Sequence, residues 1–191
     1  PGTALVSTDL KMGELVGLAQ IIVERLGLTT MATKLNTGVD MHAEIGADVL
    51  GITYGEIQAR RRSTDPGLAH AAEEARDSGK PANFGLNGGM TDLDTYVLYA
   101  RKSYGQLLCE QGPDESNDAV HARRRTKAIR IIDAWKRRAV DQQAWIEYVR
   151  RSGYRLGDRG MRYDMKHPGF VNLWRRGLSR TEATNNPFQI V

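Results

Sequence analysis

The stretch RDSGKPANFGLNGGM, residues 76–90, decides how the rest of the sequence is interpreted. In a helix that turns by about 100° per residue, one face carries Arg76, Lys80, Asn83 and Asn87, with Phe84 at its edge. Arg76 and Phe84 are then about 12 Å apart along the helix axis. Two cations followed by an aromatic ring over this length can hold a triphosphate and stack against the sugar beyond it. A solvated basic face with a core phenylalanine fits the same spacing, and spacing alone favours it.

Helix breakers interrupt the same stretch. Pro81 removes a backbone donor and clashes with the preceding helical turn. Gly79 and Gly85 lower the helix propensity on either side of it. The run GLNGG at 85–89 is typical of a helix end. Propensity alone therefore gives weak support for a helix through this segment.

On the N-terminal side the sequence predicts a strand followed by helices. Residues 3–9, TALVSTD, are short and β-prone, which predicts a buried strand that ends on Asp9. Apolar residues recur at helical spacing over 12–26. Further helices are predicted over 40–50, 54–62 and 68–84.

On the C-terminal side the sequence predicts mostly helix. A helix over 91–104 is followed by an exposed loop at 111–116 and by a long basic helix over 117–151. The core contacts expected on that basic helix are Ile129, Ile132, Trp135, Trp145 and Tyr148. Residues 152–169 are rich in Gly, Arg and Asp, so irregular loops are predicted there. The expected fold class is mainly α, of the α+β type, with many helices and few short strands.

The composition suits an intracellular protein of one or two compact lobes. The chain has 191 residues, of which 40% are hydrophobic, and this is enough for a core. A net charge of +4 favours polyanionic partners only mildly, since many unrelated proteins share it. The single cysteine, Cys109, excludes an internal disulfide framework. The sequence has no apolar run of about 18 residues and no signal peptide, so we expect no membrane partner and a cytoplasmic location.

Both ends of the sequence suggest a fragment. Pro1 is not an initiator methionine, and the last residues, 188–191, lie in an apolar stretch that is expected to continue. Near the N-terminus, a carboxylate at a strand tip such as Asp9 can bind a hard divalent cation through oxygen. An aspartate after a strand is more often a helix cap or a surface residue, so Asp9 alone does not establish a metal site.

Taken together, these residues resemble the family A (polymerase I type) DNA polymerases, and the phage members in particular. The run STDLKMGEL at 7–15 resembles that family's first catalytic motif. The run DMH at 40–42 resembles the Asp-x-His helix that precedes the fingers. The residues from Arg76 to Phe84 match the fingers spacing Arg-x3-Lys-x3-Phe-Gly. The run TEATNNPFQ at 181–189 resembles the helix that binds primer and template.

The resemblance implies template-directed DNA synthesis by nucleotidyl transfer from a dNTP to a DNA primer. Two Mg²⁺ ions would take part, bridged by Asp9 and bound by the backbone carbonyl of Leu10. The implied partners are primer-template DNA and the dNTP. The implied division is a partial palm over 1–39, fingers and following helices over 40–151, and a return to the palm over 152–191.

The resemblance also implies roles for five substrate-binding residues. Arg76 and Lys80 would hold the triphosphate with a forked guanidinium and a point ammonium. His42 would add a phosphate contact from the neighbouring helix. Phe84 would pack on the incoming sugar, and Glu14 would occupy the space that a 2′ hydroxyl needs. Without the other motifs, a satisfied surface histidine and an ordinary acid at a helix start explain His42 and Glu14 equally well.

Nucleic-acid contacts are implied for Gly88, Gly89, Asn185 and Gln189. The family usually has a tyrosine where Gly88 stands, an arginine where Val16 stands and a small residue where Ile190 stands. Its second catalytic motif, His-Asp, would lie beyond Val191. We therefore expect the chain by itself to lack polymerase activity while it retains weak nucleotide affinity.

Two other interpretations stay open. A single-subunit RNA polymerase shares an aspartate strand and an Arg/Lys fingers helix, although the NFG run at 83–85 and Glu14 argue against it. A helical nucleic-acid-binding module could use the basic runs RRRTK at 123–127 and KRR at 136–138. Such runs are usually solvated helix faces, and the module would bind nucleic acid with strong salt dependence but without a nucleotide site.

Overall fold

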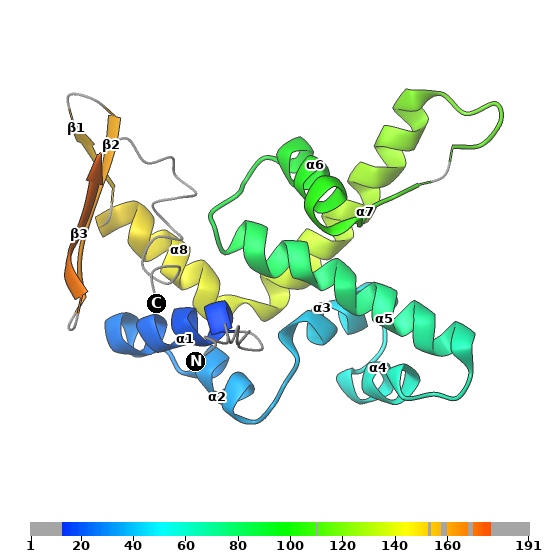
Figure 1. The fold of residues 1–191 in the computed structure, drawn as a ribbon, viewed down its shortest axis with the longest axis horizontal. Coiled ribbons are helices and arrows are strands. Elements are labelled where there is room, and N and C mark those ends of the chain that lie inside the picture. The colour runs from blue at the N-terminus through cyan, green and yellow to red at the C-terminus, as the bar shows by residue number, and fades with distance from the viewer. Residues whose placement is uncertain (1–12, 110, 153, 158–159, 168–169, 177–191) are drawn as a thin grey trace, which may run out of the picture.

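A computed structural model describes residues 13–109, 111–152, 154–157, 160–167 and 170–176 of the chain, and this part is mainly helical (Figure 1). Its helices are α1 (Gly13–Leu26), α2 (Thr30–Asn36), α3 (Met41–Leu50), α4 (Tyr54–Arg61), α5 (Pro66–Pro81), the π-helix η1 (Ala82–Leu86), α6 (Leu93–Tyr104), α7 (Asn117–Arg138) and α8 (Val140–Ser152). Strands β1 (Tyr154–Gly157), β2 (Gly160–His167) and β3 (Phe170–Arg176) form an antiparallel sheet in that order. The mainly α prediction is confirmed, while its assignment to a palm and fingers stays a prediction.

Helices α3 to α7 each begin at a side chain that accepts hydrogen bonds from the first turn. Asp40 accepts from the backbone N–H groups of His42 and Ala43 before α3. Thr53 forms a capping box with Glu56 before α4. The caps of the other three helices are Asp65, Asp92 and Ser116. These side chains satisfy backbone donors that a helix start leaves unpaired, which explains why the predicted starts lie close to the observed ones.

Three groups of apolar side chains fill the interior of the described part. The first joins α1 and α2 to Trp145 of α8. The second lies between α3, α6, α7 and α8 and includes Tyr96 and Trp135. The third joins α3, α4 and α5 around Ile57. Helix α3 contributes to all three groups through residues such as Met41 and is therefore the central element.

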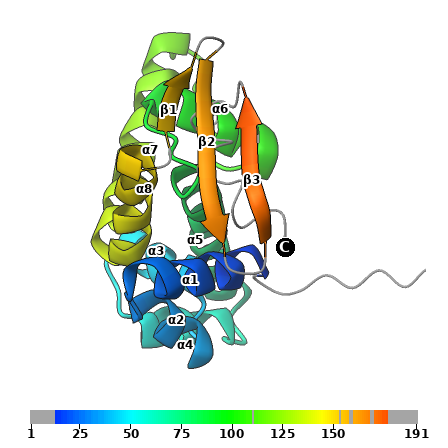
Figure 2. The same ribbon diagram turned by 90° about the vertical axis from the view of Figure 1, so that its left-hand side faces the viewer.

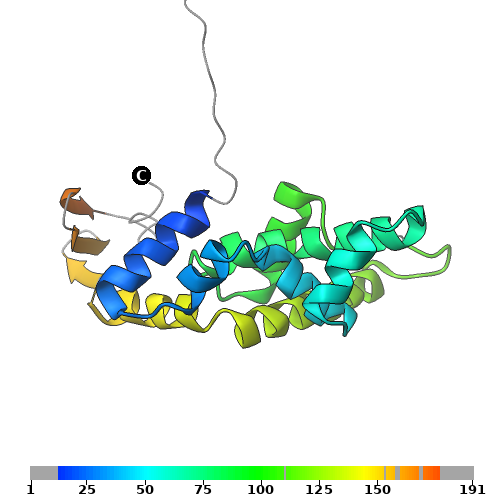
Figure 3. The same cartoon turned by 90° about the horizontal axis from the view of Figure 1, so that it is seen from below.

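Helices α3 and α5 approach closely because glycines lie at their contact (Figures 1 and 3). A Cβ atom added at Gly46 would lie 2.7 Å from the backbone carbon of Ala75. One added at Gly79 would lie 2.5 Å from the carbonyl oxygen of His42. Side chains do not fit at such distances from a backbone, so glycine at both positions permits this packing. The start of α3 therefore lies against the last turns of α5.

The helix continues past Pro81 as the π-helix η1. A π-helix forms i→i+5 hydrogen bonds, so the residues beyond Pro81 are rotated relative to a regular α-helix. Arg76 and Lys80 are partly exposed, whereas Asn83 and Asn87 are buried, with exposed fractions of 1% and 2%. The predicted polar face is thus accessible at Arg76 and Lys80 and buried at Asn83 and Asn87.

The long basic helix predicted over 117–151 is broken at Ala139, between α7 and α8. Gln143 donates through Nε2 to two backbone carbonyls at the break. The change of direction lets Asp141 accept a hydrogen bond of 2.7 Å from the backbone N–H of Met31. Helix α2, which the sequence pattern did not predict, has no side-chain cap of its own. Asp141 stabilises its first turn from a distant part of the chain.

The core residues expected on this basic segment are largely correct. Those buried or partly buried are Ile132, Trp135, Trp145 and Tyr148. The prediction for Ile129 is wrong, because its side chain is 46% exposed. Ala128 and Ile131 face the core in that turn instead.

The irregular loops predicted over 152–169 are also wrong. The sheet pairs Tyr154 with Tyr163 and Asp164 with Trp174, and Figure 2 shows it face on. The prediction gave weight to the content of Gly, Arg and Asp and overlooked the alternation of apolar and polar residues at 161–165, MRYDM, which favours a strand. The strand predicted over 3–9 lies outside the described residues.

Candidate functional site

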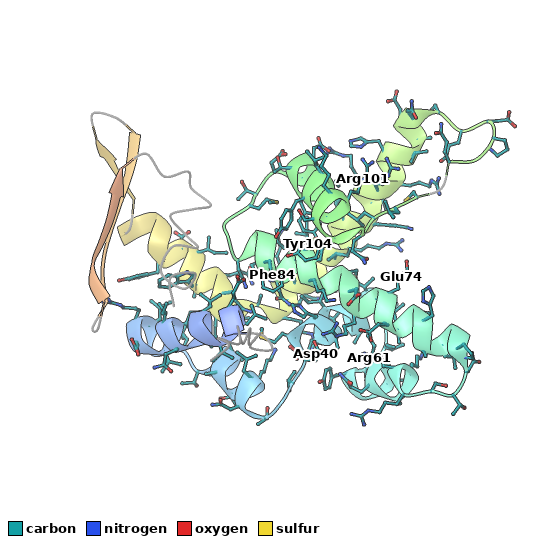
Figure 4. All side chains as sticks on the ribbon, in the orientation of Figure 1. Asp40, Arg61, Glu74, Phe84, Arg101 and Tyr104 are labelled. Atoms are coloured by element: carbon teal, nitrogen blue, oxygen red, sulfur yellow. The ribbon has the colours of Figure 1, made fainter. Side chains whose placement is uncertain are left out.

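Asp40 connects the start of α3 to α4 and α5 (Figure 4). Its Oδ2 atom lies 2.7 Å from Nε of Arg76 and 3.4 Å from Nη1 of Arg61, while its Oδ1 atom caps α3. Burial by itself would raise the pKa of Asp40. The hydrogen bond from Arg76, a backbone hydrogen bond from Ala43 and the charge of Arg76 instead hold that pKa below its usual value. Asp40 is therefore ionised at neutral pH and fixes the guanidinium of Arg76.

Arg76 and Lys80 lie one turn apart on α5 and share an acidic partner. Nη1 of Arg76 is 3.2 Å from Glu73 and 2.9 Å from Oδ1 of Asp77. Nζ of Lys80 is 2.8 Å from the same Asp77 oxygen. The side chain of Arg76 is 14% exposed and that of Lys80 is 34% exposed, so Lys80 is the more accessible cation. A phosphate that binds both cations must take over contacts that Asp77 makes.

His42 lies in the first turn of α3 and is buried, with an exposed fraction of 4%. Its Nδ1 atom is 2.9 Å from Nδ2 of Asn83. An amide nitrogen only donates, so Nδ1 is the acceptor and carries no proton. Burial is the main cause that lowers the pKa of His42 to about 4; Asp40 opposes this shift, and Arg76 and Lys80 add to it. The imidazole is therefore neutral at pH 7 and joins α3 to η1.

Aromatic rings adjoin this polar group. The ring centroids of His42 and Phe84 are 5.6 Å apart. Those of Phe84 and Tyr104 are 6.3 Å apart, with an angle of 4° between the ring planes. Tyr99 meets Tyr104 edge to face at 5.4 Å, and their hydroxyl oxygens are 3.2 Å apart. The ring of Phe84 thus contacts α3 through His42 and α6 through Tyr104, as Figure 4 shows for the second pair.

Glu14 approaches the same cluster from α1. Its side chain is in the first turn of that helix and is exposed. Burial raises the pKa of Tyr104, the hydrogen bond with Tyr99 raises it further, and the charge of Glu14 contributes to the same shift. Glu14 is therefore within electrostatic range of the ring that packs against Phe84.

Gly88 and Gly89 follow Asn87, the residue after η1, and are buried. The N–H of Gly88 donates to the carbonyl of Phe84 at 3.2 Å, and the N–H of Gly89 donates to Leu86 at 2.8 Å. The backbone thus stays helix-like for one turn beyond Phe84. The other predicted site residues lie outside the described part of the chain; they are Asp9, Leu10, Asn185 and Gln189.

The structure brings several predicted residues together where α3 meets α5 and η1, namely His42, Arg76, Lys80 and Phe84. Two residues of the cluster were missed. Asp77 precedes Lys80 by three residues, a helical spacing that predicts an ion pair. Tyr104 gave no local signal, because its contact with Phe84 depends on how α6 packs against η1.

A polar pocket of about 460 Å³ opens beside Asp40 and Arg76. Its other lining residues are Gly38, Tyr54, Gln58, Arg61, Arg62 and Glu73. Arg61 and Arg76 are both paired there with Asp40 and Glu73, so much of its charge is balanced. Within the described ranges, no group of three or more His, Cys, Asp or Glu side chains could hold a metal ion.

The basic runs of α7 are largely paired with acids. The observed pairs are Arg123 with Glu115, Arg125 with Asp94, and both Arg137 and Arg138 with Asp48. Lys127 and Arg130 are exposed on the same helix. These ion pairs are consistent with a solvated helix face that is joined to neighbouring segments through Glu115, Asp94 and Asp48.

In the part of the chain that the structure describes, no helix has the length and apolar character needed to cross a membrane. The chain matches no protein-family model, no curated protein and no solved structure. The resemblance to the family A DNA polymerases therefore rests on the motif residues themselves.

Proposed function

We propose that this chain belongs to a template-directed DNA polymerase of the family A type, in which it contributes the nucleotide-binding helix. The observation that carries the proposal is the convergence of Arg76, Lys80 and Phe84 on His42 of α3. Adjacent cations and an aromatic ring provide what a nucleoside triphosphate needs, namely positive charge for the phosphates and a flat apolar surface for the sugar.

The two cations share the binding of the triphosphate. Asp77 is paired with both Arg76 and Lys80. Phosphate oxygens that replace this carboxylate keep each cation paired, so binding leaves no uncompensated charge at the partly buried Arg76. Lys80 is the more exposed of the two and makes the first contact with the incoming anion.

His42 helps to orient the aromatic ring of Phe84. His42 contacts the ring of Phe84 and holds Asn83, the residue before it, through a buried hydrogen bond. In the proposed complex Phe84 packs on the sugar, and His42 adds a contact to a phosphate. Glu14 occupies the space next to the 2′ carbon and thereby favours dNTPs over ribonucleotides.

Asp9 and the backbone carbonyl of Leu10 are the proposed ligands of Mg²⁺, which when bound activates the primer 3′ oxygen and stabilises charge on the leaving pyrophosphate. The proposed site residues within the described part of the chain act on the nucleotide rather than on the metal. Arg76 and Lys80 hold its phosphates, and Phe84 orients its sugar relative to the primer.

Primer extension by the protein at its full natural length tests the proposal. We expect template-directed, Mg²⁺-dependent incorporation of dNTPs, which Asp9→Ala abolishes and Lys80→Ala weakens through a higher KM. Lys127→Ala on α7 is the matched control and should leave the KM unchanged, because Lys127 lies outside the cluster. A preference for ribonucleotides would indicate an RNA polymerase. Salt-sensitive DNA binding without incorporation would indicate a nucleic-acid-binding module.

A further inference from the structure

Tyr104, the last residue of α6, packs against Phe84 although it belongs to none of the motifs found in the sequence. The two ring planes are nearly parallel, at 4°, and the ring of Tyr104 is partly buried. Parallel offset rings at such distances attract one another and restrict each other's rotation. The orientation of Phe84 therefore depends on a residue from another helix.

Gly85 lets this arrangement form. A Cβ atom at Gly85 would lie 2.9 Å from Cε1 of Tyr99, so the Tyr99 ring occupies the space of the absent side chain. Tyr99 in turn contacts Tyr104 edge to face, and the two hydroxyl groups are 3.2 Å apart. Gly85 and Tyr99 together fix the ring of Tyr104 beside Phe84.

Gly88 follows Phe84 by one helical turn and adds no side chain to the packing around its ring. Its N–H bonds to the carbonyl of Phe84, so residue 88 lies one turn after Phe84 on the same side of the helix. Side chains at this spacing are neighbours, and a side chain at position 88 would lie beside the ring of Phe84. Gly88 has no side chain and is buried, and the ring that packs against Phe84 comes from Tyr104 of α6.

We propose that Tyr104 is a positioning residue of the nucleotide site, which holds the ring of Phe84 toward the sugar. This inference rests on the proposed function. Tyr104 packs on Phe84, one of the two residues assigned to the sugar, and the charge of the other, Glu14, contributes to the raised pKa of its hydroxyl. Its loss should weaken nucleotide binding more than it slows the chemical step.

Single-nucleotide incorporation by the protein at its full natural length tests this role. We expect Tyr104→Ala to raise the KM for dNTP about tenfold, as the loss of an aromatic pair would, with kcat changed by less than about threefold. Tyr104→Phe keeps the ring and should keep the KM within about twofold. Retention of the KM by Tyr104→Phe is the expected rescue, because the phenylalanine ring keeps the packing on Phe84.

Val97→Ala, a core change elsewhere on α6, controls for a general loss of stability, and melting temperatures are compared for all variants. A KM that rises equally in Val97→Ala and Tyr104→Ala, or that Tyr104→Phe raises as much as Tyr104→Ala does, would overturn the role of Tyr104 alone. Absence of Asp9-dependent incorporation by the unaltered protein would overturn the proposed function, and the role of Tyr104 with it.

Discussion

The carboxylate of Asp40 and the guanidinium of Arg76 form an ion pair of 2.7 Å that joins the N-terminal cap of α3 to α5. Both side chains are largely buried, with exposed fractions of 13% and 14%. One residue thus starts the helix that carries His42 and also holds Arg76, the first of the two cations proposed to bind phosphate. The proposed nucleotide site and the stability of the α3–α5 contact are therefore linked through Asp40.

Replacing Asp40 by Asn should separate these two roles, because asparagine caps a helix as well as aspartate does but carries no charge. We expect Asp40→Asn to lower the free energy of unfolding at pH 7 by about 1–3 kcal/mol, the usual contribution of a hydrogen bond to a charged group. Asp65→Asn is the matched control: Asp65 caps α5 but forms no ion pair within the described residues. Urea unfolding measures the free energy of unfolding of both variants. Equal losses in Asp40→Asn and Asp65→Asn would show that the ion pair with Arg76 adds no stability beyond the helix cap.

The Asp40 pair should also respond to acid. The pKa of Asp40 is lower in the folded protein than its ordinary value of 3.8. Its contribution is therefore fully present above that value and disappears as the pH falls through the lower folded pKa. The difference in unfolding free energy between the unaltered chain and Asp40→Asn should accordingly shrink as the pH falls below 3.8.

His42 should titrate far below an ordinary histidine. Its pKa in the folded protein is about 4, against 6.5 for the free side chain. The unfolded chain therefore binds more protons between these values, so His42 costs stability as the pH falls from 6.5 toward 4. NMR titration of the imidazole should give a midpoint near 4, and His42→Gln should remove this part of the pH dependence.

Added dNTP should raise the His42 midpoint if a phosphate approaches the ring, because a negative charge favours the protonated form. A midpoint near 6.5 without nucleotide would contradict the buried position of the ring. A midpoint that nucleotide leaves unchanged would remove the phosphate contact from the proposed role of His42.

Gly79→Ala should destabilise the α3–α5 contact. The new Cβ would meet the backbone oxygen of His42 at 2.5 Å, and a backbone cannot move aside as a flexible side chain can. Overpacking of this kind costs about 1–3 kcal/mol. Gly55→Ala in α4 is the control, since its nearest neighbour is at 3.9 Å, and it should stabilise the chain by about 0.5–1 kcal/mol. A neutral Gly79→Ala in thermal or urea unfolding would show that the two helices pack less closely.

Phe84→Tyr should ease the incorporation of nucleotides that lack a 3′ hydroxyl. The added phenol can supply a polar partner near the sugar that such nucleotides otherwise lack, and one hydrogen bond corresponds to about a tenfold change in discrimination. Competition between dNTP and 2′,3′-dideoxy-NTP in primer extension measures this discrimination. Equal discrimination before and after the change would remove Phe84 from the sugar site.

Local signals in the sequence predicted much of the fold. Helix starts were predictable where a capping residue precedes an amphipathic stretch, as at Asp40 and Thr53. Helix α2 was not, because its first turn is capped by Asp141 from α8 rather than by a neighbour. The π-helical turn after Pro81 was not predictable either, because Pro81 and the glycines around it argue against a continuous helix there.

The candidate site likewise contains residues that the sequence predicts and residues that only the structure reveals. Arg76, Lys80 and Phe84 were found because their spacing along one helix is visible in the sequence. Tyr104 depends on the packing of α6 against η1, so only the structure reveals it. The burial and neutral state of His42 likewise follow from the close contact at Gly79 and not from the residues next to it in sequence.

Nucleotide binding by the 191-residue chain is the most direct test of the proposal that α5 carries a nucleotide-binding site. Isothermal titration calorimetry with Mg²⁺-dATP should be run on the unaltered chain, on Lys80→Ala and on Lys127→Ala, which remove the same charge from α5 and from α7. We expect weak but measurable binding that Lys80→Ala lowers about tenfold or more and Lys127→Ala leaves within about twofold, because a charge-assisted contact is specific to its site. Equal losses in the two variants, or no binding by a chain that is folded by circular dichroism, would contradict this proposal.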